Sequence, residues 1–420
     1  MDRQYLCIDL KSFYASVECV ERGLDPMTTL LAVCDLERTE KTICLAITPA
    51  MKALGVKNRC RVFEIPKSIK YIAARPRMQL YLDYAAEVYA VYLSFVSKDD
   101  IHVYSVDEVF MDVTEYLKLY DKTARQLGQM IMDEIYKKLG IRATCGIGTN
   151  LYLAKIALDI TAKHADDFIG ELDEESYRQT LWDHRPITDF WMVGPGTARS
   201  LERIGVTTMR GICETSEDIL YHMYGVNAEL LIDHAHGIEP TTIADIKNYR
   251  SKTSSLSSGQ VLPEDYDFEH GRLIVKEMTD LLCLDLVEKN LVTGSVTLHI
   301  GYSNRLDLPP AHGTVKLDEE TSSDLVIIPK TCELYDRIID RTSPIRRVTI
   351  TFNRVCPEEF VQLSMFTNAG ELERNRKVQK AVIDIKNRFG KNAVIKGMNL
   401  EEGAKTIERN SQIGGHRSGD

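Results

Sequence analysis

The sequence predicts an α+β protein built from several domains, and three observations favour this class. At 420 residues the chain is too long for one typical hydrophobic core. Over about the first 165 residues, short apolar strands alternate with helices whose apolar positions recur at helical spacing. A mostly helical block follows over residues 168–237, and a Ser-rich stretch at 251–260 then leads into a second unit of strands and helices that ends near residue 355.

The first unit opens with an apolar strand that ends at Asp9, followed by a helix over residues 12–23. Short strands are expected at 30–35 and 42–47, and a short helix is expected to have Thr48 as N-cap, Pro49 at its first position and Gly55 at its end. The rest of the pattern predicts helices over 77–96 and 124–140, two strands around a tight reversal within 101–114, and a strand over 141–149.

In the second unit, apolar and polar residues alternate in three segments, as in strands, and apolar residues recur at helical spacing in two others. The predicted strands cover 294–303, 322–329 and 346–355, and the predicted helices cover 271–282 and 331–340. The last 50 or so residues are polar and show no persistent apolar face. From residue 371 to the end, eleven Lys and Arg stand against seven Asp and Glu, so this segment is basic although the whole chain has a formal net charge of −10.

Composition and cysteine usage are typical of a soluble cytoplasmic protein. Hydrophobic residues make up 44% of the chain and charged residues 27%, as in ordinary globular domains. The ten cysteines form no C-x-x-C pair and resemble reduced core thiols. The N-terminus lacks a secretion signal, and no window reaches the roughly 20 apolar residues that a membrane span needs. We therefore expect no membrane association.

Three carboxylates are the strongest chemical signal. Asp107 and Glu108 stand side by side at the strand reversal in YSVDEVFMDV, and Asp9 at the end of a neighbouring strand could join them. Hard oxygen ligands without His or Cys suit Mg²⁺, and two such ions can activate a hydroxyl and stabilise a leaving phosphate. Two adjacent acids alone are more often solvated residues of an exposed turn, so the context of the acids decides.

Five motifs supply that context. They are IDLKSFYASVE at 8–18, AMKALGVK at 50–57, YSVDEVFMDVT at 104–114, CGIGTNLYLAKIA at 145–157 and VGPGTARSLERIG at 193–205. In their order and spacing they resemble the Y-family translesion DNA polymerases, and TDFWMVGPGTA with the basic tail is most similar to the UmuC-like branch, the UvrX-type UV-damage repair proteins of Gram-positive bacteria, phages and mobile elements. The resemblance covers essentially the whole chain.

The resemblance implies a right-hand polymerase and its domains. The expected parts are a ferredoxin-like palm (1–27 and 79–167), small fingers (28–78), a helical thumb with a helix-hairpin-helix (168–238), a linker (239–250), an α/β little finger (251–357) and a basic tail (358–420).

It also implies the residues of the active site. The metal ligands of the family fall on Asp9, Asp107, Glu108 and the backbone carbonyl of Leu10, which would hold two Mg²⁺ ions. The aromatic residue that excludes ribonucleotides falls on Tyr14. Its neighbour Phe13, four residues before Val17, is expected to face the core.

Triphosphate contacts are implied at Lys52 and Lys163, although AKIALDITAK has one residue more between its lysines than the common pattern. Two positions depart from the family. Many relatives carry Tyr where Pro49 stands, so a phosphate-contacting hydroxyl is missing, and many carry Asp or Asn where Lys11 stands, so Lys11 is not counted as a ligand. Lys52 and Lys163, taken alone, would more often be solvated surface residues.

Two further motifs concern macromolecular partners. Gly194 and Gly196 can expose backbone N–H groups to a DNA phosphate, or can simply connect two helices. The peptide QLSMF resembles the short bacterial motif that docks on the sliding clamp (β subunit), with Leu363, Met365 and Phe366 in an apolar groove and Gln362 in polar contacts.

The resulting hypothesis is a low-fidelity lesion-bypass DNA polymerase of the SOS response that uses primer-template DNA and dNTPs. A UmuD-like or recombinase accessory partner stays open. One rival is a catalytically idle scaffold that binds DNA and the clamp; a nucleotidyl cyclase with a similar palm is another, although cyclases lack the thumb hairpin and the clamp peptide.

Overall fold

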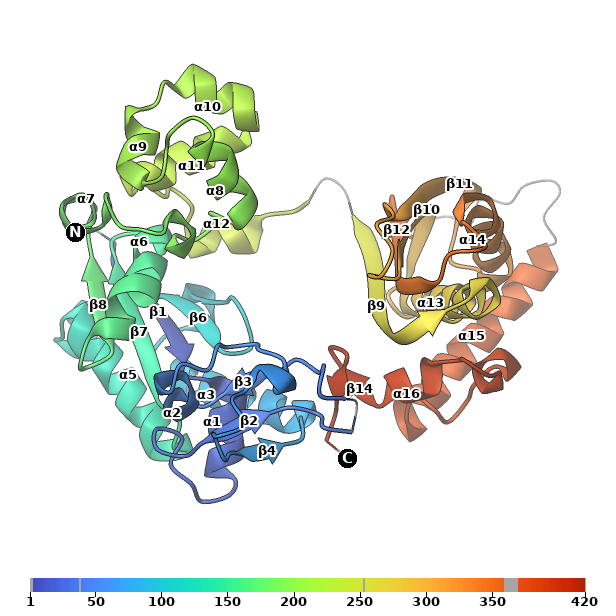
Figure 1. The fold of residues 1–420 in the computed structure, drawn as a ribbon, viewed down its shortest axis with the longest axis horizontal. Helices are drawn as coiled ribbons and strands as arrows, with labels where there is room; N and C mark the ends of the chain where they lie inside the picture. Colours follow the sequence, from blue (N-terminus) through green and yellow to red (C-terminus); the bar gives the residue numbers. More distant parts are fainter. Residues whose placement is uncertain (1–2, 38, 252–253, 359–368, 420) are drawn as a thin grey trace. The chain divides into compact units, whose positions relative to one another are not determined.

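A computed structural model describes residues 3–37, 39–251, 254–358 and 369–419 of the chain (Figure 1). The described residues divide into two compact units, whose boundary lies between Tyr249 and Arg250. All ten cysteines lie in the described part, and none of them forms a disulfide. The α+β multidomain class predicted from the sequence is confirmed.

A five-stranded sheet forms the centre of the first unit. Its strand order is β5 (Ile101–Val103), β6 (Glu108–Asp112), β1 (Tyr5–Leu10), β7 (Ala143–Gly148) and β8 (Ile169–Leu172). β1 pairs antiparallel with β6 and β7, and β8 pairs parallel with β7. The predicted strands at both ends of the 101–114 reversal and at 141–149 are therefore confirmed. The sheet also extends to β8, which lies inside the range expected to be helical.

Helical layers cover both faces of this sheet. Alternate residues of a strand point to opposite faces. On one face, Cys7 of β1 packs with Leu151 of α6 (Leu151–Ile156); on the other, Leu6 lies beside Gly128 of α5 (Ala124–Leu139). The helices predicted from residues 12 and 77 are present as α1 (Phe13–Val20) and α3 (Met78–Leu93), and a short α4 (Tyr116–Tyr120) precedes α5.

Gly146 and Gly148 permit close packing of α6 against β7. A Cβ atom on Gly146 would lie 2.1 Å from the carbonyl oxygen of Ala154, and one on Gly148 would lie 2.2 Å from the backbone nitrogen of the same residue. Such contacts are far shorter than van der Waals distance, so only glycine fits at either position. These glycines therefore serve strand-to-helix packing.

A small three-stranded sheet, β3 (Ala46–Ile47), β2 (Leu31–Val33) and β4 (Ile72–Ala74), packs near α2 (Pro49–Ala53). Thr48 holds the N-cap position of α2 as predicted, but its hydroxyl accepts a hydrogen bond from the backbone N–H of Leu31, at 3.2 Å, instead of capping the helix. Gly55 follows the helix with φ of 82°, which suits glycine.

The helical part of the first unit has its own core. Its helices are α7 (Glu174–Leu181), α8 (Pro195–Glu202), α9 (Met209–Glu214), α10 (Glu217–Tyr224) and α11 (Asn227–His236). The segment predicted to be a linker contains a helix, α12 (Ile243–Asn248), and Ile243 is buried against Tyr5 and Cys7 of β1. This segment is therefore packed onto the first unit.

The second unit is a four-stranded antiparallel sheet covered by two helices. The order is β11 (Ala311–Thr321), β10 (Leu291–Tyr302), β12 (Ile345–Asn353) and β9 (Ser255–Tyr266), with a short β13 (Cys356–Pro357) beside β10. The long helices are α13 (Phe268–Glu288) and α14 (Asp324–Ile338). Strands 294–303 and 346–355 are confirmed.

The predicted strand over 322–329 is wrong, since these residues lead into and begin α14. The buried side chains of α14 follow helical spacing, as at Ile327, Thr331, Leu334 and Tyr335. The eight residues of the predicted strand are too few to reveal this spacing. Two long strands of this unit were missed: β9, which takes up more than half of the Ser-rich stretch at 251–260, and β11, whose sequence is mostly polar.

The chain after residue 369 is folded, although no apolar face was found in its sequence. It contains α15 (Ala369–Phe389), α16 (Thr406–Asn410) and a hairpin of β14 (Gln412–Ile413) and β15 (His416–Arg417). Polar contacts anchor it: the buried carboxylate of Glu277 in α13 accepts hydrogen bonds from Asn399 Nδ2 at 2.8 Å and from the backbone N–H groups of Lys405 at 2.7 Å and Thr406 at 3.2 Å. The predicted clamp peptide, Gln362 to Phe366, lies outside the described residues.

Candidate active site

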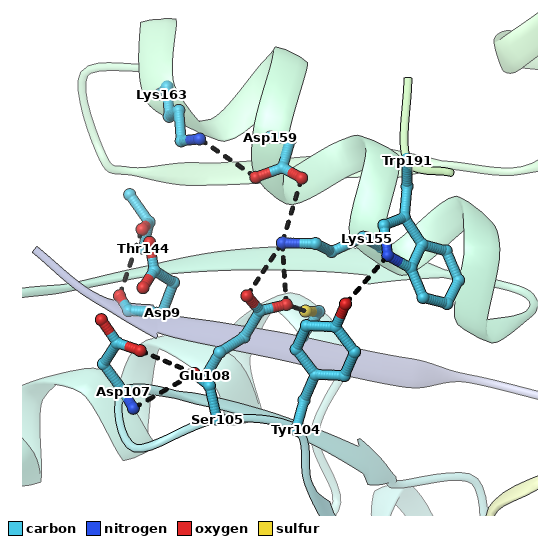
Figure 2. A network of polar contacts seen from close by, with 11 residues as sticks. Asp9, Tyr104, Ser105, Asp107, Glu108, Thr144, Lys155, Asp159, Lys163 and Trp191 are labelled. Atoms are coloured by element: carbon cyan, nitrogen blue, oxygen red, sulfur yellow. Dashed lines mark hydrogen bonds and ion pairs between the residues drawn. The ribbon is translucent and has the colours of Figure 1, made fainter. Parts of the chain in front are cut away.

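The three predicted carboxylates meet at one edge of the sheet of the first unit. Asp9 of β1 stands directly opposite Glu108 in the pairing of β1 with β6, and Asp107 ends the turn before β6. The turn is held by backbone and side-chain contacts: Leu10 N–H donates to the Asp107 carbonyl at 2.9 Å, and Ser105 Oγ donates to Asp107 Oδ1 at 2.6 Å. Figure 2 shows the three acids close to one another.

The electrostatics of this cluster fit a divalent cation. Burial, with the neighbouring negative charges of Asp107 and Glu108, raises the pKa of Asp9 from its ordinary value of 3.8 to about 7. A cation among these acids would remove the repulsion between them, and an all-oxygen donor set suits Mg²⁺. Among the described residues, no three acid, His or Cys side chains stand ready to hold a metal together. Glu108 instead faces a lysine.

Glu108 is engaged by a lysine that sequence reasoning missed. Lys155 of α6 lies 2.8 Å from one carboxylate oxygen of Glu108 and 3.0 Å from Asp159, and Cys7 Sγ donates to Glu108 at 3.3 Å (Figure 2). Burial would lower the pKa of Lys155, but the surrounding Cys7, Asp159 and Glu108 raise it above its ordinary value. Lys155 thus acts as the counter-ion of Glu108. The signal in the sequence was a lysine within the apolar helix LYLAKIALDI, with an acid four residues later.

A π-helical turn places the acid between two lysines. The helix continues from α6 into a π turn over Ala157–Thr161, where hydrogen bonds span five residues instead of four. The extra residue noted in the sequence between Lys155 and Lys163 falls at this turn. Asp159 lies in this turn, four residues from each lysine in the sequence, and contacts both ammonium groups at 3.0 Å.

Lysines gather on the Asp9 side of the site. Burial lowers the pKa of Lys52. The negative charge of Asp9 raises this pKa, and the positive charge of Lys163 lowers it. Lys11, the residue that departs from the family, has its ammonium 3.9 Å from the centre of the Phe168 ring; burial lowers its pKa, while Asp9 acts in the opposite direction. Lys11, Lys52 and Lys163 therefore lie close enough to Asp9 for their charges to interact with it.

The two neighbouring aromatic residues at the start of α1 differ in burial. Phe13 is buried, whereas Tyr14 is half-buried and stacks on Tyr81 of α3 with ring centres 4.7 Å apart. Burial raises the pKa of Tyr14, and the charge of Asp107 adds to this effect. The Tyr14 hydroxyl therefore lies within electrostatic reach of Asp107. The preceding Ser12, with φ of 50°, has a buried hydroxyl that finds no hydrogen-bond partner within the described residues.

The glycine hairpin forms the start of α8. Gly194 is its N-cap residue with φ of −81°, and Pro195 is its first residue. A Cβ atom on Gly194 or Gly196 would meet nothing within 4 Å. Neither packing nor backbone geometry therefore requires glycine here, and the exposed hairpin surface is open to the close approach of another molecule.

The chain matches known families over both of its units. Residues 8–159 match the impB/mucB/samB family, and residues 253–365 match the C-terminal domain of that family. The chain is 28% identical over 418 residues to the "Putative UV-damage repair protein UvrX" of Bacillus subtilis, with 99% of this chain and 98% of the other covered. It is 29% identical over 418 residues to DNA polymerase IV 2 of Halalkalibacterium halodurans, with coverage of 99% and 100%.

A solved structure shares the fold. A Y-family DNA polymerase chimera superposes with a TM-score of 0.66 at 20% sequence identity, covering 84% of this chain and 99% of the other. Within the described ranges of the chain, the structure contains no helix that is long and apolar enough to cross a membrane.

Proposed function

The chain belongs to the impB/mucB/samB family of Y-family DNA polymerases, and on this basis we propose that it copies damaged DNA as a low-fidelity, lesion-bypass DNA polymerase of the SOS response, acting in the cytoplasm. The observation that supports this most is the convergence of Asp9, Asp107 and Glu108 at one sheet edge beside a group of lysines. Primer-template DNA and dNTPs are the substrates.

We assign the domains accordingly. Residues 1–27 and 79–167, with β8, form the palm, and 28–78 form the fingers. The rest of residues 168–238 supplies the thumb, 239–250 connect the units, 251–357 form the little finger and 358–420 form the tail.

The reaction is attack of the primer 3′-hydroxyl on the α-phosphate of the dNTP, with pyrophosphate leaving. Two magnesium ions, when bound, supply activation of that hydroxyl and neutralise charge on the leaving phosphates. Asp9, Asp107, Glu108 and the carbonyl of Leu10 would hold them. For this, Glu108 has to exchange its contact with Lys155 for a contact with the ions, because its carboxylate now faces the ammonium group.

The remaining residues bind and orient the nucleotide. Lys52 and Lys163 neutralise triphosphate charge, and Lys11 adds a third cation on the same side. Tyr14 lies on its stacking partner Tyr81 as a flat surface for the sugar of the dNTP, where a 2′-hydroxyl would collide. Thumb contacts at Gly194 and Gly196 would hold the DNA backbone without reading its sequence.

The sliding clamp is the proposed protein partner, through Gln362, Leu363, Met365 and Phe366. A peptide of this kind docks by placing its apolar residues in a groove of the partner. The alternative function is a DNA- and clamp-binding scaffold whose catalytic site is idle.

Primer extension separates the two functions. Asp107→Ala and Glu108→Ala should each lower extension by several orders of magnitude and leave primer-template binding largely intact, because each carboxylate holds the charge that stabilises the transition state. Asp99→Ala, an exposed acid before β5, is the matched control and should extend normally. Near-normal extension by both active-site variants, or no extension by the parent protein, would contradict the polymerase assignment.

A further inference from the structure

Tyr104 connects the turn of the catalytic acids to a tryptophan of the helical block. The turn closes when the backbone N–H of Tyr104 donates to the carbonyl of Glu108 at 3.0 Å. The Tyr104 side chain leaves the turn and meets Trp191, whose indole N–H donates to the Tyr104 hydroxyl at 3.1 Å (Figure 2). The two rings also pack edge to face, with centres 6.0 Å apart.

Trp191 is fixed on its other side within the helical block. Its ring lies 5.8 Å from that of His234 in α11, at an interplanar angle of 21°, and His234 is buried and pairs with Glu239 at 3.1 Å. Three residues after Trp191, the chain reaches Gly194 and the open hairpin at the start of α8. The buried Val193 fixes the short stretch between them.

The second tryptophan of the chain shows what is specific about this arrangement. The indole N–H of Trp182 donates to the carbonyl of Ala235 at 2.8 Å, so that side chain holds the helical block together internally. Trp191 instead extends to the turn that carries Asp107. Both rings also pack against the buried Phe110 of β6, with ring centres 5.7 Å from Tyr104 and 6.4 Å from Trp191, whereas the hydrogen bond joins Trp191 to the turn itself.

We propose that Trp191 is a positioning residue that couples DNA contact at the Gly194–Gly196 hairpin to the turn that holds Asp107 and Glu108. The proposal rests on the proposed function, because it assumes that the hairpin contacts DNA and that the turn binds the metal ions. A displacement of the hairpin is transmitted through only two residues, Met192 and Val193, to Trp191, and through one hydrogen bond and one ring contact to Tyr104. DNA binding and metal binding would thereby favour each other.

The test measures this coupling directly. Affinity for Mn²⁺ is measured by the paramagnetic resonance of the free ion, with and without primer-template, and ions held by the DNA itself are subtracted with Asp107→Ala. We expect primer-template to raise the affinity of the parent for Mn²⁺ about fivefold, the factor that corresponds to a single net hydrogen bond. Trp191→Phe and Tyr104→Phe each keep a ring but lose the bond, and each should reduce the factor to about one.

The expected pattern is specific to coupling. Mn²⁺ affinity without DNA and DNA affinity without Mn²⁺ should stay unchanged, and the double variant should behave like either single variant. Trp182→Phe and Tyr221→Phe, which change an indole and an exposed phenol of the same helical block, should keep the full factor. Thermal unfolding shows whether each variant is folded. If Trp191→Phe does not fold, the test uses Tyr104→Phe, which removes the same hydrogen bond from its more exposed end.

Three results would overturn the proposal: no DNA-dependent gain in the parent, an unchanged gain in both variants, or a loss of DNA affinity with the gain retained, which would mean that Trp191 only packs or grips DNA. The proposed function can fail separately. A parent protein that shows the coupling but extends no primer would leave the coupling established and refute the polymerase.

Discussion

The raised pKa of Asp9 makes a prediction about stability that needs no polymerase assay. Because the folded protein keeps a proton on Asp9 at pH values where the unfolded chain has lost it, Asp9 favours folding at low pH. This contribution is complete below the ordinary pKa of 3.8 and disappears as the pH rises to about 7. The protein without metal should therefore lose stability between these two pH values.

The magnitude follows from the shift. A pKa of about 7 in place of 3.8 corresponds to about 4 kcal/mol in the free energy of unfolding. Asp9 retains some contact with water, which screens its interactions, so we expect about half of this, roughly 2 kcal/mol. For a unit of this size, that is a change of about 5 °C in the midpoint of thermal unfolding.

The substitution that isolates the effect is Asp9→Asn, which keeps the shape and removes the charge. Calorimetry in a chelator at pH 5 and pH 8 should show that the variant gains about 3 °C on the parent at pH 8 relative to pH 5, because about 60% of the whole effect falls between these two pH values. Added Mg²⁺ should stabilise the parent at pH 8 but hardly affect the variant. Asp99→Asn serves as the control for an exposed acid. Parallel pH profiles of parent and Asp9→Asn would refute the reasoning.

Three further predictions concern the nucleotide, the metal and the clamp. Tyr14→Ala should raise the ratio of ribonucleotide to deoxynucleotide incorporation at least about tenfold, as removal of a clash worth slightly more than 1 kcal/mol would do; an unchanged ratio in a folded variant would show that Tyr14 only packs. Lys155→Met should destabilise the metal-free protein by about 3 kcal/mol in chemical unfolding, because Glu108 loses its counter-ion, and should tighten Mn²⁺ binding; weaker binding would contradict competition between lysine and metal. Replacing Leu363 and Phe366 with Ala should abolish clamp-stimulated synthesis on primed DNA and spare basal synthesis, whereas equal stimulation would mark the peptide as a chance match.

Much of the first unit was predictable because its local patterns agree with its fold. β1 is an unbroken apolar strand, so the acid at its end was visible, and the reversal before Glu108 could be read from the alternating residues on both sides. The sequence spacing also placed Phe13 in the core and Tyr14 away from it, as the structure shows.

The missed features depend on tertiary contacts. Lys155 meets Glu108 only because α6 packs closely on β7, which brings together residues 47 positions apart in the chain. The first turns of α14 were mistaken for a strand because a short apolar run fits either period. The folded tail was missed because its docking relies on polar groups around Glu277, and such contacts leave no periodic apolar pattern.

The docking of the tail on Glu277 has a consequence for the synthesis of the protein. Glu277 belongs to α13, in the first part of the second unit, but two of its three hydrogen-bond donors are backbone groups of Lys405 and Thr406. Burying a carboxylate without hydrogen-bond donors costs free energy. The Glu277 side of α13 therefore cannot reach its final packing while the ribosome is still adding the tail. The second unit therefore reaches its final packing only after residue 406 has emerged, whereas the first unit can fold much earlier. A chain that stops before residue 399 would leave the carboxylate of Glu277 without any of these three donors.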